Sequence, residues 1–150
     1  MTASIAALPA FSRGPVWLRA AALFGICWNA FGVFQFANSF TAAGRAAMTA
    51  GMTAAQAQAY LSLPAWVGLA FAVGAFGGLV GAAALALNRR IALPVLVASF
   101  VGYVLLFAAD AAHGVFDGTP GQLIVLALVV AISAALLGAA MRASRRGLLR

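Results

Sequence analysis

The chain contains no lysine and no glutamate, and its 150 residues include only one histidine, one cysteine and two aspartates. Without lysine no Schiff-base cofactor can be attached, and one histidine cannot supply a bis-imidazole haem. The single Cys27 leaves no disulfide framework and no CxxC redox pair. No nucleophile–base–acid set and no glycine-rich phosphate loop can be drawn. We therefore expect no enzymatic activity and no cofactor.

Charge is also scarce, because only 7% of the residues are charged while 65% are hydrophobic. Soluble domains carry about 25% charged residues, so a chain this short and apolar needs the bilayer as its solvent. The formal net charge of +7 comes from nine arginines against two aspartates. These arginines stand at the ends of apolar runs, where they indicate membrane topology and not a nucleic-acid partner.

Four apolar runs predict an all-α integral membrane bundle of four transmembrane helices, a single domain over residues 16–141. The spans are residues 16–40, 64–87, 91–109 and 122–141, followed by a basic cytoplasmic tail at 142–150. Residues 1–15 form a lead-in. A cleaved signal peptide is the alternative there, but the apolar run from Ala20 to Phe40 is longer than the ~7–15 residues of a signal core.

The first outer loop, residues 41–63, is rich in alanine, which favours helix over coil. Thr53 and Gln56 have the spacing of a capping box, in which each side chain caps the other residue's backbone N–H. This spacing predicts a short surface helix that starts at Ala54 and ends before Pro64.

The arginines are distributed asymmetrically between the two ends of the predicted bundle. One end holds Arg13, Arg19, Arg89, Arg90, Arg142, Arg145, Arg146 and Arg150, and the other holds Arg45, Asp110 and Asp117. Cytoplasmic loops carry the excess of basic residues, so we expect a multi-pass membrane protein with both termini cytoplasmic. Five of these arginines either bind anionic lipid head groups in addition to fixing the topology, or fix the topology alone. They are Arg89, Arg90, Arg142, Arg145 and Arg146.

The most specific pattern is the glycine face of the second span. Gly74 and Gly78, like Gly77 and Gly81, are four residues apart, and such small-xxx-small motifs let helix backbones approach closely in lipid. The face would serve either a homo-oligomer interface or packing within the bundle. We favour packing within the bundle, because this helix must already contact the others of its own chain.

A few polar side chains fall inside the spans. Asn29 lies near the middle of the membrane, where it either lines a polar path or makes an interhelical hydrogen bond, the interpretation we favour. With Gln35, Asn38 and Asp110 it forms a candidate polar pocket toward the outer side.

Asp110, His113 and Asp117 have a spacing that could place metal ligands on one helical face. Gly114 and Gly118 interrupt the helix that would align them, so we favour a solvated loop and expect no metal site. No acidic residue lies at mid-span, which argues against a proton-coupled exporter of the small four-helix multidrug type.

The chain resembles a family of small bacterial inner-membrane proteins with four spans and no established function. The resemblance covers roughly residues 17–145. It is carried by Trp28-Asn29-Ala30-x-Gly32, by Tyr60 before Pro64-Ala65-Trp66, by Gly74, and by Leu85-x-Leu87-x-Arg89-Arg90-x-Ala92-x-Pro94 leading to Ser99. Gln35 departs from the pattern, since an acidic residue would look natural there, and the second half of span two lacks a further tryptophan. Some similar proteins carry a sugar-transporter label.

Two function classes follow from these observations. The first is a structural or accessory component of a membrane assembly, which fits the small size, the glycine face and the lack of ionisable groups at mid-span. The second is a small-solute, for example sugar, transporter acting as an oligomer, with a polar path near Asn29, Gln35, Asn38 and Asp110. The expected partners are the bilayer with its anionic lipids and either further copies of the chain or a larger membrane complex.

Overall fold

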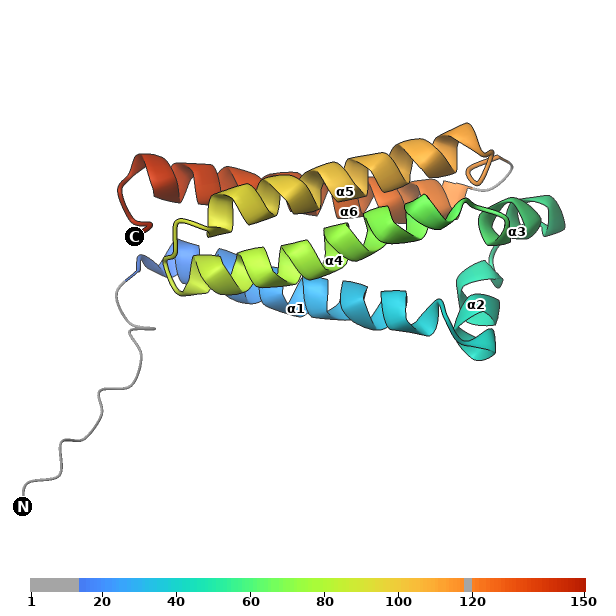
Figure 1. Cartoon of the computed structure of the whole chain (residues 1–150), viewed down its shortest axis with the longest axis horizontal. Coiled ribbons are helices and arrows are strands. Elements are labelled where there is room, and N and C mark those ends of the chain that lie inside the picture. Colours follow the sequence, from blue (N-terminus) through green and yellow to red (C-terminus); the bar gives the residue numbers. More distant parts are fainter. Residues whose placement is uncertain (1–13, 118–119) are drawn as a thin grey trace, which may run out of the picture.

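The computed structural model describes residues 14–117 and 120–150, and every regular element in them is an α-helix (Figure 1). The helices are α1 Val16–Asn38, α2 Ala42–Thr49, α3 Ala54–Leu61, α4 Ala65–Ala86, α5 Ala92–Ala112 and α6 Pro120–Arg145. The four long helices α1, α4, α5 and α6 lie side by side, and each is long and apolar enough to cross a membrane. The predicted all-α membrane bundle is thus confirmed. The lead-in lies outside the described residues except for Gly14 and Pro15.

The segment between the first two long helices contains two short helices where one was predicted. The capping box at α3 is present: Thr53 Oγ1 accepts from the Gln56 N–H at 3.3 Å, and Gln56 Oε1 accepts from the Thr53 N–H at 2.9 Å. The additional helix α2 has its own cap, because Thr41 Oγ1 accepts from the Gly44 N–H at 2.9 Å. A threonine before an alanine-rich stretch is the sequence signal for this second start.

Helices α4 and α5 end in the same way, through a residue with positive φ. Asn88 has a φ of 54° after α4, and Gly114 has a φ of 72° after α5. In each case the next N–H bonds five residues back, Arg89 to the Ala84 carbonyl at 2.8 Å and Val115 to the Asp110 carbonyl at 3.0 Å. This is a Schellman ending, which satisfies carbonyls that have no partner within the helix. Because the ending motif of α5 lies at Gly114, the helix ends at Ala112, three residues beyond the predicted end at 109.

The predicted basic tail at 142–150 is integrated into the bundle. Helix α6 continues through Arg145, and Gly147, with a φ of 65°, turns the chain back. The Arg150 N–H then donates to the Asn88 carbonyl at 2.7 Å, and the Arg90 N–H donates to the Arg150 carbonyl at 2.9 Å. The C-terminus therefore closes over the α4–α5 turn and does not extend freely.

The helices follow one another around the bundle as α1, α4, α5 and α6. Helix α4 packs extensively against both α5 and α1, whereas α1 and α6 touch only slightly. Half of the apolar stretch of α4 is buried in the bundle, against 17% for α1 and 22% for α6. Helix α4 is therefore the centre of the fold, and α1 and α6 leave most of their surface outward.

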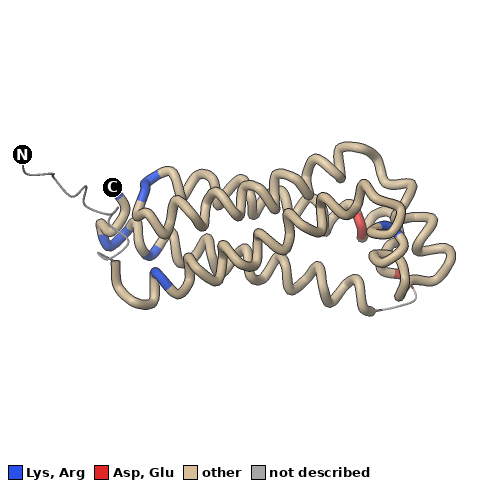
Figure 2. Tube along the Cα trace, turned by 90° about the horizontal axis from the view of Figure 1, so that it is seen from below, with Lys and Arg blue, Asp and Glu red and all other residues tan. Residues whose placement is uncertain are grey.

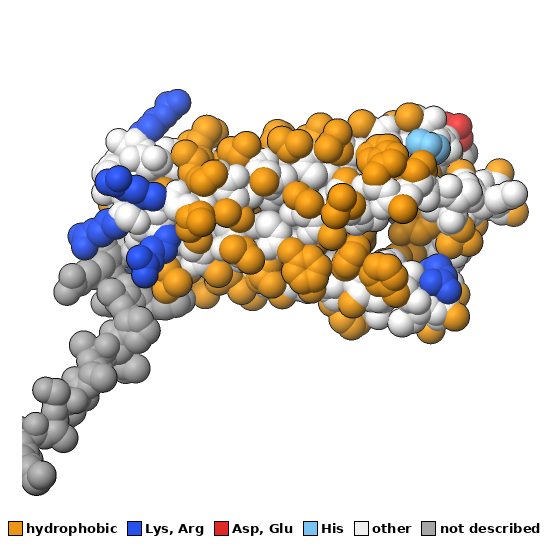
Figure 3. Space-filling view, in the orientation of Figure 1, with side chains coloured by type: hydrophobic (Ala, Val, Ile, Leu, Met, Phe, Trp, Pro, Cys, Tyr) orange, Lys and Arg blue, Asp and Glu red, His pale blue; other side chains and the backbone are white. Residues whose placement is uncertain are grey.

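We name the two ends of the bundle by their composition. At the arginine end lie both described chain ends and the α4–α5 turn, with the arginines clustered around them (Figure 2). At the loop end lie α2, α3, Arg45 and both aspartates. Hydrophobic side chains cover the surface between the ends on the face drawn in Figure 3. Arg13 is outside the described residues.

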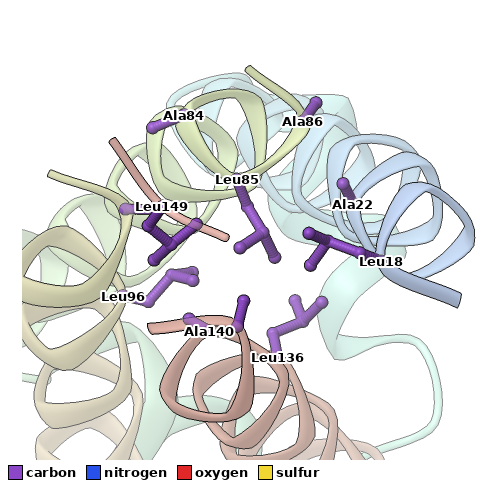
Figure 4. Close-up of a cluster of buried hydrophobic side chains, with 11 residues drawn as sticks. Leu18, Ala22, Ala84, Leu85, Ala86, Leu96, Leu136, Ala140 and Leu149 are labelled. Carbon is purple, nitrogen blue, oxygen red and sulfur yellow. The ribbon is translucent and has the colours of Figure 1, made fainter. Parts of the chain in front are cut away.

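The main hydrophobic core lies at the arginine end. Figure 4 shows leucine side chains from all four long helices and from the C-terminal segment pointing into one space. These leucines are Leu18, Leu85, Leu96, Leu136 and Leu149, each at most 6% exposed. A smaller cluster at the loop end contains Val67, Tyr103, Leu106, Ala109 and Leu126.

Candidate functional site

The glycine face of α4 is covered by neighbouring helices of the same chain. A Cβ at Gly74 would lie 2.7 Å from the Tyr103 ring, and one at Gly81 would lie 2.7 Å from Leu96, both on α5. A Cβ at Gly77 would lie 3.3 Å from the Ser99 Cβ, and one at Gly78 would overlap the Asn29 side chain of α1. The four glycines thus allow α5 and α1 to approach the α4 backbone closely. These two helices occupy the glycine face, so it offers no free surface for a second copy of the chain.

Helix α5 contributes a matching close approach. A Cβ at Gly102 would lie 2.8 Å from the Ala70 carbonyl oxygen and from the Gly74 nitrogen of α4. The buried Ser99 hydroxyl donates to the Gly74 carbonyl at 2.6 Å. Small residues and an interhelical hydrogen bond drive association in lipid, where apolar burial alone does not.

Asn29 lies in the middle of the bundle, is 2% exposed, and has partners on two helices. Its Nδ2 donates to the Gly25 carbonyl at 2.8 Å, and its Oδ1 accepts from the Tyr103 hydroxyl at 3.2 Å. The amide is thereby held in place and faces the Gly78 backbone. The geometry matches an interhelical hydrogen bond and not a polar path.

A cavity of about 340 Å³ occupies the loop half of the bundle. All six helices contribute residues to its walls. Helices α1 and α6, on either side of it, touch only slightly along their whole lengths. On the face drawn in Figure 3 the surface is also hollowed at this end. The lining residues are Trp28, Phe31, Gly32, Gln35, Ala47, Met48, Tyr60, Phe71, Tyr103, Leu106, Asp110, Gln122, Val125, Leu126 and Val129.

Of the four predicted pocket residues, Gln35 and Asp110 line this cavity. Asn29 does not, but it binds the hydroxyl of Tyr103, which forms part of the wall. Asn38 lies at the end of α1 and is not among the lining residues. The sequence missed the aromatic walls and Gln122, because they converge only through the packing of distant segments.

Asp110 is the most unusual residue of the site. The residue is 1% exposed, and its Oδ1 atom has no hydrogen-bond partner in the part of the chain that the structure describes. Burying a carboxylate without a partner is costly, so native proteins rarely retain one without a reason.

The neighbouring cationic and titratable side chains have other partners. Arg45 donates to the Ser39 and Phe40 carbonyls at 3.3 and 3.2 Å, next to the C-terminal end of α1. His113 lies 2.8 Å from the Ala109 carbonyl through Nδ1. The Tyr60 hydroxyl donates to Met48 Sδ at 3.3 Å, and burial together with the charge of Asp110 raises the pKa of Tyr60.

One polar contact connects the loops over the cavity end of the bundle. Gln56, which is 1% exposed, donates from Nε2 to the Val115 carbonyl at 3.0 Å. The residue that completes the α3 capping box therefore also attaches α3 to the α5–α6 connection. The capping box was visible in the sequence, but its tertiary contact was not.

The acidic loop after α5 does not assemble a metal centre within the described residues, where no cluster of three or more His, Cys, Asp or Glu side chains occurs. Asp110 is buried in α5, whereas His113 and Asp117 are exposed after it. Gly114, which has a positive φ after α5, separates Asp117 from Asp110 and His113, and Gly118, the second predicted break, lies outside the described residues.

The arginines at the opposite end lie at the surface. Arg89, Arg90, Arg142, Arg145 and Arg146 are all exposed. The Arg142 guanidinium lies 5.7 Å from the centre of the Trp17 ring, a cation–π distance that joins α6 to α1.

No family model matches the chain, and neither a curated protein nor a solved structure matches it. The resemblance to small four-span membrane proteins therefore stays a prediction from the residues that carry it.

Proposed function

We propose that this multi-pass membrane protein is an accessory or structural component of a membrane assembly. The observation that carries the proposal is the closed arginine half. There, leucines from all four long helices fill the centre, and Asn29 is bound to Tyr103 and Gly25 above them. A protein that conducts a solute needs a polar path at this depth.

The outward surfaces of α1 and α6 support the same proposal. Phe24, Phe31 and Phe34 on α1, and Ile124 and Leu128 on α6, are each at least 50% exposed. Lipid covers such surfaces, and a partner helix can replace lipid there at little cost because both are apolar.

Affinity purification tests this proposal. The full chain, tagged at the C-terminus, is purified from native membranes in a mild detergent, and its partners are quantified against a tagged unrelated four-span protein. We expect a partner in fixed stoichiometry. Recovery of only this chain, as a monomer or homo-oligomer, would contradict the accessory role.

The second candidate is a small-solute transporter, for which the loop-half cavity is the favouring observation. Such a carrier would need a second conformation in which the arginine half opens. Proteoliposomes loaded with sugar and assayed for counterflow test this alternative. Time-dependent, saturable exchange of labelled sugar would favour the transporter.

We further propose that the protein lies in the bacterial inner membrane with the arginine end in the cytoplasm. The orientation rests on the clustering of arginines at that end, and the choice of membrane rests on the resemblance to small bacterial inner-membrane proteins. Alkaline phosphatase fused at Arg150 should be inactive, and the same enzyme fused in the loop at Gly51 should be active. The reverse pattern would overturn the orientation.

A further inference from the structure

Asp110 brings a carboxyl group to the cavity wall, where no arginine or histidine of the described residues lines the cavity beside it. Its carboxylate is almost completely buried, and its Oδ1 has no partner among the described residues. Arg45 donates to the Ser39 and Phe40 carbonyls, and His113, which interacts electrostatically with Asp110, lies against the Ala109 carbonyl and outside the cavity wall. A cationic ligand would compensate this carboxylate by its charge and, where it carries N–H groups, also by hydrogen bonding.

The rest of the wall suits an organic cation. Five aromatic side chains line the cavity: Trp28, Phe31, Tyr60, Phe71 and Tyr103. The faces of aromatic rings attract cations, most strongly where water is excluded. The side-chain carbonyls of Gln35 and Gln122 can accept N–H bonds at the same wall.

Other ligand classes fit less well. An anion would meet the charge of Asp110, and a sugar would leave most hydroxyls facing apolar carbon. A metal ion needs several oxygen or nitrogen ligands, and no group of three acidic, histidine or cysteine side chains exists in the described residues. The volume of about 340 Å³ is at the lower end for small-molecule sites.

We propose that the loop-half cavity binds a small organic cation, an amine or quaternary ammonium compound with a compact apolar body, with Asp110 as the counter-charge and the surrounding aromatic rings as its walls. This site is independent of the accessory role, because a subunit of an assembly and a carrier could both contain it. Failure of the partner search therefore leaves this proposal intact, and the reverse also holds.

Binding is tested on the full chain in dodecyl maltoside micelles, because this detergent is uncharged and lacks the quaternary ammonium group that phosphatidylcholine would offer to the site as a competitor. The probe is benzyltrimethylammonium, and its neutral isostere neopentylbenzene is the matched control. Calorimetry gives the affinity, and tryptophan fluorescence, to which Trp28 in the wall contributes together with Trp17 and Trp66, gives a second signal. We expect the cation to bind at least about tenfold more tightly than the isostere, since a desolvated charge pair distinguishes them.

The variant D110N removes the charge with little change in shape, and D117N is its matched control, because Asp117 is exposed and outside the cavity wall. We expect D110N to weaken cation binding at least about tenfold and D117N to leave it unchanged. If D110N does not fold, the comparison of the two probes on the unmodified chain decides. Equal binding of cation and isostere, unchanged binding in D110N, or binding of glucose but not of the cation would overturn the proposal.

Discussion

The two halves of the bundle are built from the same four long helices, but one half is closely packed and the other contains a cavity. In the arginine half, leucines from every long helix meet, and the C-terminal segment closes over them. In the loop half, residues from all six helices, polar and aromatic ones among them, surround a cavity. The Asn29–Tyr103 hydrogen bond lies at the boundary between the halves.

This difference in packing indicates which half of a small membrane protein can contain a binding site. Close packing through glycine and leucine stabilises one half sufficiently for the other half to keep a cavity and a buried carboxylate. Functional sites commonly contain such locally unfavourable features, which the rest of the fold compensates. The predictions below test whether stability and binding are divided in this way.

The largest effect is expected for truncation of a leucine in the packed half. Leu85→Ala should lower the free energy of unfolding by about 2–4 kcal/mol, because the surrounding helices cannot collapse into the cavity left behind. Leu106→Ala should cost less, since Leu106 already borders an open space. Unfolding by SDS titration in mixed micelles measures both. Equal losses would remove the contrast between the halves.

A leucine at a glycine of α4 should have the next largest effect. Gly81→Leu should cost about 1–3 kcal/mol, because the added side chain meets Leu96 at once. Gly68→Leu is the matched control on the same helix, since a Cβ there meets nothing within 4 Å. It should be neutral or slightly stabilising in the same titration. A loss as large at Gly68 would show that helix α4 packs through another face.

The loop end can be loosened separately through Gln56. Gln56→Ala should cost about 1–2 kcal/mol, because it removes half of the capping box and the hydrogen bond to the Val115 carbonyl. Hydrogen exchange should then increase in α3 and in the α5–α6 connection while the arginine half keeps its protection. Uniformly faster exchange would mean that the two halves unfold as one unit.

The smallest effect is expected at the boundary between the halves. Tyr103→Phe removes only the hydroxyl that donates to Asn29, and interhelical hydrogen bonds in membrane proteins are worth about 0.6 kcal/mol on average. A double-mutant cycle of Tyr103→Phe with Asn29→Ala, followed by SDS unfolding, measures this coupling. A coupling near zero would mean that the pair does not connect α1 to α5.

Structural features that depend only on residues close together in the sequence could be predicted from the sequence. The capping box at Thr53, the glycine break after α5 and the four long apolar runs all follow from local chemistry. The second short helix α2 was missed, although Thr41 before an alanine-rich stretch is a local signal for its start. The closing of the C-terminal segment was also missed, because the hydrogen bonds of Arg150 to the α4–α5 turn are backbone contacts without a sequence signal.

By itself, the sequence determined that this is a four-helix membrane protein, because apolar length and the positions of charge decide which segments can lie in a bilayer. Only the tertiary structure decided that the glycine face of α4 is divided between α5 and α1. It alone also showed that Asp110 and Gln35 share a cavity with aromatic side chains from four helices, α1, α3, α4 and α5. These outcomes depend on crossing geometry and side-chain fit between distant segments, which no single stretch of the chain encodes.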